Sequence, residues 1–123
     1  MSYRAAGTIK LSKADKDFSL QVRTERDFTC EHCGKRDEHY VCCHHVEGRT
    51  NKRLRFERNN ICLLCPSCHT FNDDFSAHRT PKDFKAWFAQ KFPERWNFIQ
   101  EHRNEKWNEQ YAIKQFYSLA STF

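Results

Sequence analysis

The chain has 123 residues, the length of a single domain, and Leu, Ile, Val and Phe make up only 24 of them. Its 30% charged residues would suit a disordered chain, but 15% of its residues are aromatic and it carries seven Cys and seven His. This composition is typical of a small fold that supplements its core with a bound metal. The net charge of +5 favours a polyanionic partner such as nucleic acid.

Membrane insertion and secretion are both disfavoured by the sequence. The longest strongly apolar run covers residues 61–65, far short of the roughly 20 residues that span a bilayer. The first residues lack the apolar stretch of a signal peptide. We therefore expect no membrane partner and a cytoplasmic location, where cysteines serve as metal ligands rather than as disulfides.

The first predicted element is a helix over residues 13–26, which follows an N-terminal arm. Ala14, Phe18 and Val22 recur at helical spacing and predict one buried face. Ser12, with an acid three residues later at Asp15, resembles a capping pair. This helix is expected to cover one side of the domain.

A metal knuckle and a hairpin are predicted next, over residues 28–45. A turn around residues 30–34 is followed by a short strand over 39–45, with Tyr40 and Val41 at its centre. Residues 46–59 predict a polar, basic loop, and residues 60–64 resume extended structure.

The second half of the chain is predicted to be helical. Pro66 suits the first turn of a helix that runs to residue 77, and the next helix has Thr80 as its N-cap and Pro81 at its first position. A further helix begins at Pro93, and a last helix carries aromatic side chains from Trp107 onward. We interpret the aromatic residues of this region as core, and a base-stacking platform is the alternative. The aromatic and aliphatic positions concerned are Phe84, Trp87, Phe88, Phe92, Trp96, Ile99, Trp107, Tyr111, Ile113, Phe116 and Tyr117.

Two CxxC pairs carry the strongest chemical signal. They are separated by 31 residues and comprise Cys30, Cys33, Cys65 and Cys68. Four thiolates in two close pairs suit a closed, tetrahedral zinc site. A redox motif is the alternative, but it would require a βαβ context that the pattern lacks. The nearby Cys42, Cys43 and Cys62 are interpreted as small apolar residues of the hairpin.

Between and around these pairs the sequence reads VCCHHVEGR from residue 41 and RLRFERNNICLLCPSCH from residue 53. In this region, about residues 28–75, the chain resembles the HNH endonucleases, the ββα-metal or His-Me finger nucleases with a zinc-stapled core. Their pattern is CxxC, then Asp-His or His-His, then Asn shortly before LCxxCH or LCxxCN. Small stand-alone phage and prophage members are the most similar in layout.

The resemblance implies a role for each matched residue. The four cysteines would bind structural zinc, His45 would be the general base, His44 would hold a catalytic divalent metal, and Asn60 would orient the base and its loop. His69 would be a second ligand of that metal, although it could instead ligate zinc beside Cys68.

The pattern leaves open which residue is the third metal ligand and which metal is bound. Asp73 lies four residues after His69 and would share its helix face, with Asn72 and Asp74 as competitors. The catalytic metal is expected to be Mg²⁺ or Mn²⁺, or else Ni²⁺ or Zn²⁺, because this chain has His44 where many members of the family have Asp.

Basic residues of the 46–59 loop are expected to contact DNA phosphates, and a solvated loop is the alternative interpretation. They are Arg49, Lys52, Arg53, Arg55 and Arg58. The other four histidines have no motif around them and are interpreted as ordinary surface residues; they are His32, His39, His78 and His102.

Together these patterns predict one α+β domain over residues 1–123. A zinc-bound ββα-metal core occupies about residues 28–78, with one helix before it and two or three helices in an extension over about 80–121. The expected function is metal-dependent endonucleolytic cleavage or nicking of DNA, which leaves 5′-phosphate and 3′-hydroxyl ends. The alternatives are a nuclease for branched DNA or RNA, and a non-catalytic zinc module that binds nucleic acid.

The resemblance also suggests a setting and partners. A bacterial cell or a phage-infected host cell is the expected location. Besides DNA, the partner is expected to be a second copy of the chain, joined through the C-terminal helices, or another DNA-processing protein.

Overall fold

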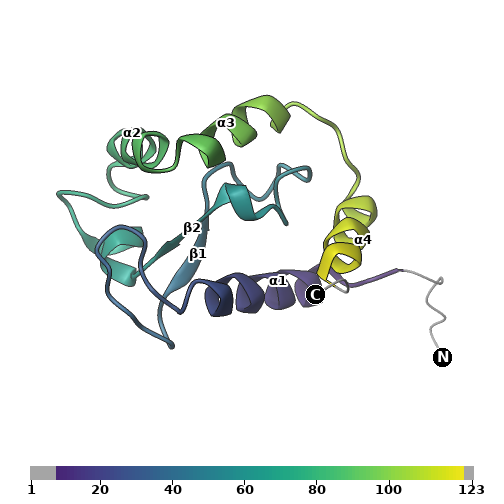
Figure 1. Ribbon diagram of the computed structural model, residues 1–123, viewed down its shortest axis with the longest axis horizontal. Coiled ribbons are helices and arrows are strands. Elements are labelled where there is room, and N and C mark those ends of the chain that lie inside the picture. Colours follow the sequence, from purple (N-terminus) through teal and green to yellow (C-terminus); the bar gives the residue numbers. More distant parts are fainter. Residues whose placement is uncertain (1–7, 121–123) are drawn as a thin grey trace.

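The computed structural model describes residues 8–120; residues 1–7 and 121–123, which include the last position of the predicted C-terminal extension, lie outside the described residues. The described part is a mixed α+β structure, as predicted (Figure 1). Its elements are α1 (Leu11–Glu25), β1 (Cys42–His45), the 3₁₀ turn η1 (Arg58–Asn60), β2 (Ile61–Leu64), the π-helical turn η2 (Ser67–Phe71), α2 (Pro81–Lys91), α3 (Pro93–His102) and α4 (Glu109–Ala120).

The two strands form an antiparallel hairpin between two helical layers (Figure 1). In that view α2 and α3 lie above the hairpin, α1 lies below it, and α4 returns to pack beside α1. Strand β2 is buried along its whole length. Its side chains alternate, so that Ile61 and Leu63 join the core on the α1 side while Cys62 and Leu64 join the core on the α2–α3 side.

Aromatic side chains supply much of both cores. Phe84 and Phe88 of α2 are at most 1% exposed on one side, and Phe18 of α1 packs edge-on against Phe116 of α4 on the other. These rings replace the scarce aliphatic residues as buried apolar surface. The interpretation of the helical region as core is therefore confirmed for these buried positions.

Helix α1 starts earlier than the sequence predicted. It begins at Leu11, Lys10 is its N-cap, and no side chain caps it, so the predicted pairing of Ser12 with Asp15 is wrong. The Asp15 carboxylate instead pairs with Arg55, 2.7 Å away. The predicted buried face is confirmed, since Ala14, Phe18 and Val22 are at most 1% exposed.

Strand β1 begins later than predicted because the side chain of an acidic residue holds the preceding residues in a turn. The Asp37 carboxylate accepts hydrogen bonds from the backbone N–H groups of His39 and Tyr40, both at 3.0 Å. Such bonds hold a turn rather than a strand. Only residues 42–45 pair with β2, in a register that places His44 opposite Cys62 and His45 opposite Ile61.

The helix predicted over residues 66–77 is wrong beyond its first turn. Only η2 forms, and Asn72 then turns to extended backbone. The Asn72 side-chain oxygen accepts from the N–H groups of Asp74 and Phe75, at 2.8 and 3.2 Å, which gives the backbone an alternative to helix. The chain folds back, and the His78 N–H donates to the carbonyl of His69 at 3.1 Å.

Helices α2 and α3 begin at Pro81 and Pro93, as predicted, and α4 is the third helix of this region. Thr80 occupies the N-cap position of α2, but its hydroxyl bonds to the backbone of Ser76 rather than to the helix. Helix α4 begins at Glu109, so Trp107 precedes it instead of belonging to it. Within residues 8–120, no helix has the length and apolarity required to cross a bilayer.

Candidate functional site

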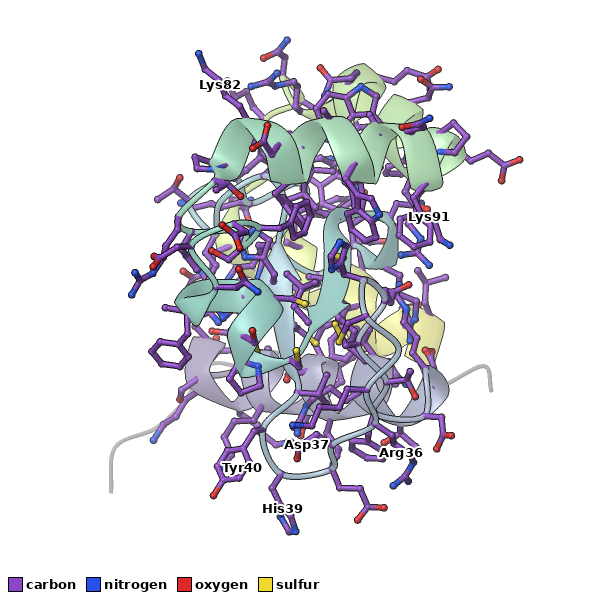
Figure 2. All side chains as sticks on the ribbon, turned by 90° about the vertical axis from the view of Figure 1, so that its left-hand side faces the viewer. Arg36, Asp37, His39, Tyr40, Lys82 and Lys91 are labelled. Atoms are coloured by element: carbon purple, nitrogen blue, oxygen red, sulfur yellow. The ribbon has the colours of Figure 1, made fainter. Side chains whose placement is uncertain are left out.

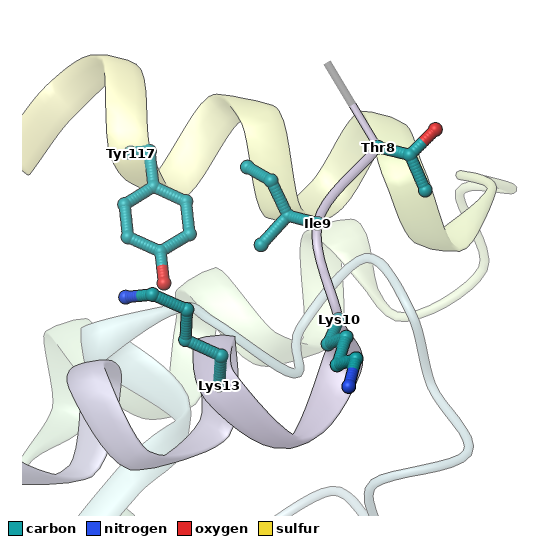
Figure 3. A pocket seen from close by; sticks show the side chains of 5 residues that line it. All are labelled: Thr8, Ile9, Lys10, Lys13 and Tyr117. Carbon is teal, nitrogen blue, oxygen red and sulfur yellow. The ribbon is translucent and has the colours of Figure 1, made fainter. Parts of the chain in front are cut away.

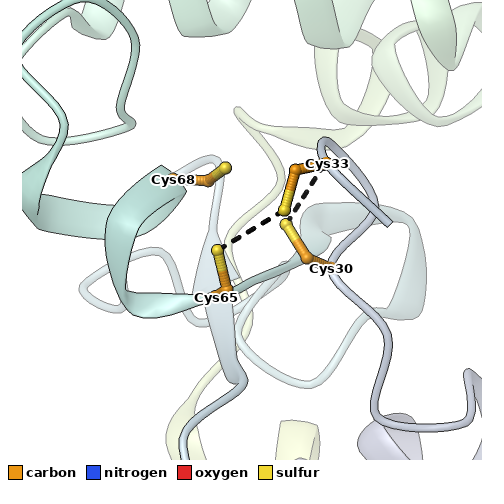
Figure 4. A group of neighbouring side chains, drawn as sticks. All are labelled: Cys30, Cys33, Cys65 and Cys68. Carbon is orange, nitrogen blue, oxygen red and sulfur yellow. Dashed lines mark hydrogen bonds between the residues drawn. The ribbon is translucent and has the colours of Figure 1, made fainter. Parts of the chain in front are cut away.

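Four cysteines gather where the knuckle meets the end of β2 (Figure 4). Their sulphur atoms all lie within 4.8 Å of one another, and those of Cys33 and Cys65 are 3.7 Å apart. Two sulphurs of a tetrahedral zinc site with bonds of about 2.3 Å would be about 3.8 Å apart. The predicted group of Cys30, Cys33, Cys65 and Cys68 is therefore confirmed as a cluster that can hold a metal ion such as zinc.

The knuckle is shaped by its own backbone hydrogen bonds. The Gly34 N–H donates to the Cys30 carbonyl at 2.9 Å, and the Cys30 N–H donates to the Lys35 carbonyl at 2.8 Å. Gly34 has a φ of 82°, a left-handed conformation that glycine adopts without steric cost. The knuckle is tied to the sheet by the Glu31 N–H, which donates to the Leu63 carbonyl at 2.7 Å.

A nearly buried carboxylate fixes the knuckle to the helices. Glu31 pairs with Arg26 at the end of α1, at 2.8 Å, and with Arg95 of α3, at 2.9 Å. The Arg26 guanidinium also donates to the carbonyls of Ile61 and Arg58. The cysteine cluster is therefore connected to both helical layers by directed polar contacts.

Three histidines form a second cluster of metal-ligating type. The candidate ligand atoms of His44, His69 and His78 lie within 4.8 Å of one another, and the Nε2 atoms of His69 and His78 are 2.9 Å apart. The pairing of His44 with His69 agrees with the sequence prediction. His78 is exposed, as predicted, but it is not an isolated surface histidine, because the turn after η2 brings it against His69.

The predicted third ligand, Asp73, lies outside this cluster. Its carboxylate is exposed and pairs with Arg79. The helix that would have placed Asp73 beside His69 ends at Phe71. Asp74 is also outside the cluster within the described chain, and the Asn72 side-chain oxygen accepts from the N–H groups of Asp74 and Phe75.

A cysteine supports one of the three imidazoles. The Cys42 thiol donates to the Leu64 carbonyl at 3.3 Å, and its sulphur lies 3.2 Å from Nδ1 of His69. Because the thiol proton is directed at the Leu64 carbonyl, the sulphur acts as an acceptor toward His69. The His69 ring then carries its proton on Nδ1, and its Nε2 has the free lone pair. Contacts of this kind fix the orientation of a metal-ligating histidine. Cys42 thus has a polar role besides the apolar one predicted for it.

Two histidines of the cluster, His44 and His69, are held in the neutral form. Burial, reinforced by the neighbouring imidazoles, lowers the pKa of His44 to about 3 and that of His69 to about 4. A neutral imidazole has a free nitrogen lone pair, which is the form that binds metal ions.

His45 follows His44 on β1 and is held differently. Its Nε2 donates to the Arg55 carbonyl at 2.9 Å, so its Nδ1 carries the lone pair. That Nδ1 is buried and has no hydrogen-bond partner in the described structure. Burial also lowers the pKa of His45. The ring is therefore a neutral, oriented acceptor.

The two neighbouring histidines border one cavity although they face different helices. His44 packs edge-on against Phe84 of α2, and His45 lies beside Phe18 of α1. Strand β1 ends at His45, and both residues line a cavity of about 260 Å³, which His69, His78 and Arg49 also line.

Asn60 is completely buried and ties the loop between the strands. Its side-chain amide donates to the carbonyls of Glu47 and Leu54, at 2.9 and 3.0 Å, and its oxygen accepts from the Glu47 N–H at 2.7 Å. Leu54 directly precedes Arg55, whose carbonyl holds His45. Asn60 therefore holds the loop between the strands, and its predicted role in orienting a catalytic base stays a prediction.

Three of the five predicted phosphate-binding residues have internal partners instead. Arg55 makes a two-bond contact with Asp15, Arg58 pairs with Glu25, and Arg53 pairs with Glu105. Arg53 also lies over the Trp107 ring, 4.1 Å from its centre, and is 11% exposed. These three arginines fasten the loop to α1 and to the segment before α4. Arg49 and Lys52 remain exposed.

The remaining histidines have varied surroundings. His32 stacks on Phe75 with ring centres 3.9 Å apart, and its Nδ1 lies 3.3 Å from the sulphur of Cys68. His102 pairs with Glu105. Figure 2 shows His39 at the outer tip of the knuckle loop, pointing away from the body of the molecule, as predicted for a surface residue. The alternative role of His69 as a zinc ligand is not supported, since it belongs to the imidazole cluster.

A separate cavity of about 360 Å³ lies between the start of α1 and α4 (Figure 3). Thr8, Ile9, Lys10, Lys13 and Tyr117 line it, and none of them is a candidate ligand or base. The Lys13 ammonium pairs with Asp17 at 2.6 Å. This cavity has no part in the histidine site.

Comparison with protein-family models, with curated proteins and with solved structures finds no match to this chain. The family resemblance therefore rests on the ordered motifs alone.

Proposed function

We propose that this protein is a metal-dependent endonuclease of the HNH type that hydrolyses phosphodiester bonds of DNA. One observation carries the proposal. The unpartnered Nδ1 of His45 belongs to a ring that borders the same cavity as the imidazoles of His44, His69 and His78. An oriented base beside a metal-ligating cluster is the arrangement that hydrolysis of a phosphodiester requires.

His45 would act as the general base. Its Nδ1 would take a proton from a water molecule that enters beside it from the cavity, while the Arg55 carbonyl holds the opposite N–H and so fixes the ring orientation. The same carbonyl stabilises the imidazolium formed after proton transfer, because an N–H donor binds a carbonyl more strongly when the ring is charged. Asn60 acts through the adjacent peptide as a positioning residue.

The three imidazoles would hold the catalytic metal. When bound, a divalent ion supplies charge neutralisation at the scissile phosphate and at the leaving oxygen. The donor set is all nitrogen, and imidazole suits Zn²⁺ or Ni²⁺ better than Mg²⁺, which prefers oxygen ligands. Three ligands leave coordination positions open, as catalytic sites require.

The four cysteines would bind structural zinc. All four donors are sulphur, three of the residues are buried, and the cluster has no further protein ligand within the described chain. A closed tetrathiolate site of this kind stabilises a fold and does not bind substrate.

The order β1, β2, η2 supports a ββα-metal core, with His44 and His45 at the end of the first strand and His69 on the turn after the second. The turn is only five residues long, where the resemblance implies a longer helix. The products proposed from the resemblance are 5′-phosphate and 3′-hydroxyl ends.

The decisive experiment is a cleavage assay on supercoiled plasmid. The zinc-loaded protein is incubated with Ni²⁺, Zn²⁺, Mn²⁺, Mg²⁺ or EDTA, beside the variants His45→Ala and His39→Ala. We expect nicked or linear DNA with at least one metal, at least a 100-fold slower reaction for His45→Ala, and an unchanged rate for the surface control His39→Ala.

Two results would count against the proposal. Absence of cleavage with every metal, combined with retained DNA binding, would support a non-catalytic zinc module. Equal cleavage by wild type and His45→Ala would remove His45 as the base.

A further inference from the structure

A groove of about 400 Å³ lies on the outer face of α1, next to the histidine cavity. Six α1 residues and Arg49 line it, and Arg49 also lines the cavity that contains His44 and His45. Arg49 therefore borders both the groove and the proposed site of hydrolysis.

The groove is electropositive once its internal ion pairs are counted. Its two acids are already neutralised, since Asp15 binds Arg55 and Asp17 binds Lys13, and neither of these cations lines the groove. The groove's own cations are Lys16, Arg23 and Arg49. Within residues 8–120, none of these three forms an ion pair with a carboxylate.

The spacing of the cations suits a phosphate backbone. Lys16 and Arg23 are seven residues apart on α1, two turns along the same face, and the helix rise separates them by about 10 Å. Along one strand of duplex DNA, phosphates recur about every 3.4 Å of helix axis, so this span covers about three phosphates. The Arg23 Nε is bonded to the Ser19 carbonyl and hydroxyl, and these bonds hold its guanidinium along the helix.

The chemistry of the lining distinguishes duplex from single strand. Among residues 8–120, no aromatic side chain lines the groove. Proteins that bind single strands combine cations with aromatic rings on which bases stack, whereas contacts to a duplex backbone need only donors and positive charge.

We propose that this groove binds the phosphate backbone of double-stranded DNA through Lys16, Arg23 and Arg49, and leads the strand to the histidine cavity. The inference rests on the proposed nuclease function and names the surface that presents its substrate. It replaces Arg53, Arg55 and Arg58 as the expected phosphate contacts.

Binding can be tested separately from cleavage. In the zinc-loaded His45→Ala background, affinity for a short labelled DNA duplex is measured by fluorescence anisotropy between about 50 and 200 mM salt. The test variant combines Lys16→Ala, Arg23→Ala and Arg49→Ala. The control combines Lys35→Ala, Lys91→Ala and Lys114→Ala, which removes equal charge from exposed positions outside the groove.

Each lost phosphate contact should reduce the slope of log affinity against log salt by about 0.9. We expect the magnitude of the slope to be roughly 2 to 3 smaller for the test variant than for the parent protein. For the control, the slope should decrease by less than about 1. Equal slopes for the two variants would overturn the groove assignment. Tighter binding of the single strand than of the duplex would overturn the choice of duplex DNA.

Failure of this inference is distinguishable from failure of the nuclease proposal. If wild type cleaves plasmid while both triple variants bind alike, the groove is wrong and the nuclease stands. If the slopes differ as expected but no metal supports cleavage, the groove stands as a DNA-binding surface and the catalytic proposal is wrong.

Discussion

The cysteine cluster and the histidine cluster share one turn of chain, since Cys68 and His69 are neighbours on η2, yet their surroundings differ. Three of the four cysteines are buried, and the knuckle is fixed to both helical layers through Glu31. The histidines border a cavity, and His78 is exposed. A closed site suits a metal that stabilises the fold, and an open one suits a metal that meets a ligand. Four substitutions test this division.

The largest effect is expected from Cys65→Ser. A structural zinc ion contributes an apparent free energy on the order of 10 kcal/mol in small zinc domains, as much as the whole stability of a typical domain. We expect the variant to lose bound zinc and its cooperative thermal transition, measured by metal analysis and circular dichroism. Cys43→Ala, a half-buried cysteine outside the cluster, should keep both. A zinc-free Cys65→Ser protein that unfolds like wild type would contradict a structural role.

Glu31→Gln should be the next most damaging change. It leaves the guanidiniums of Arg26 and Arg95 without their carboxylate, and the three side chains are only 13% to 22% exposed. We expect a loss of about 3 kcal/mol in the free energy of unfolding, measured with urea. The control Glu38→Gln removes the exposed pair with Arg36 and should cost less than about 1 kcal/mol. Equal losses would show that the knuckle does not depend on the buried pair.

Asn60→Ala is expected to affect both regions. The variant loses three hydrogen bonds of a buried side chain, so we expect a loss of about 2 kcal/mol in unfolding free energy. It also releases the peptide that holds His45, so plasmid cleavage should fall at least about 10-fold. In the control Asn59→Ala, the lost side chain bonds only to Glu57, and both effects should be small. Unchanged cleavage by Asn60→Ala would remove its positioning role.

His78→Ala should have the smallest effect on the fold. An exposed residue of this kind changes the unfolding free energy by no more than about 0.5 kcal/mol. The zinc-loaded wild type should nevertheless be stabilised by added Ni²⁺, by about 2.7 kcal/mol at a hundredfold excess over the dissociation constant, and the variant should lose this gain. Thermal unfolding with and without Ni²⁺ measures the difference, with His39→Ala as the control. If Ni²⁺ stabilises both variants equally, His78 is not a ligand.

The same comparison separates what the sequence predicts from what it does not. Residue spacing predicts the cysteine pairs and the buried face of α1. The pairing of His44 with His69 is predicted from motifs, and the local structure preserves the positions of those motifs. The helix over 66–77 was mispredicted because the Asn72 side chain competes with helical hydrogen bonds. Had that helix formed, His78 would lie about 13 Å along its axis from His69, out of reach of a shared metal.

Charge patterns also misled for a physical reason. Arg55 and Arg58 look like free cations along the chain, but their partners Asp15 and Glu25 are 40 and 33 residues away in sequence. Such pairs depend on how α1 packs against the loop, and composition cannot reveal them. What the sequence could not indicate was which cations remain unpaired after folding.

The turn η2 has a thermodynamic consequence. It supplies Cys68 to one cluster and His69 to the other, and the turn that follows is bonded to both, through Ala77 to Cys68 and through His78 to His69. Metal binding at the two clusters would therefore be linked. A zinc ion that orders the thiolates would also set the spacing of the imidazoles and so raise their affinity for a second ion. By reciprocity, an ion held by the imidazoles would raise the affinity of the thiolates for zinc by the same factor.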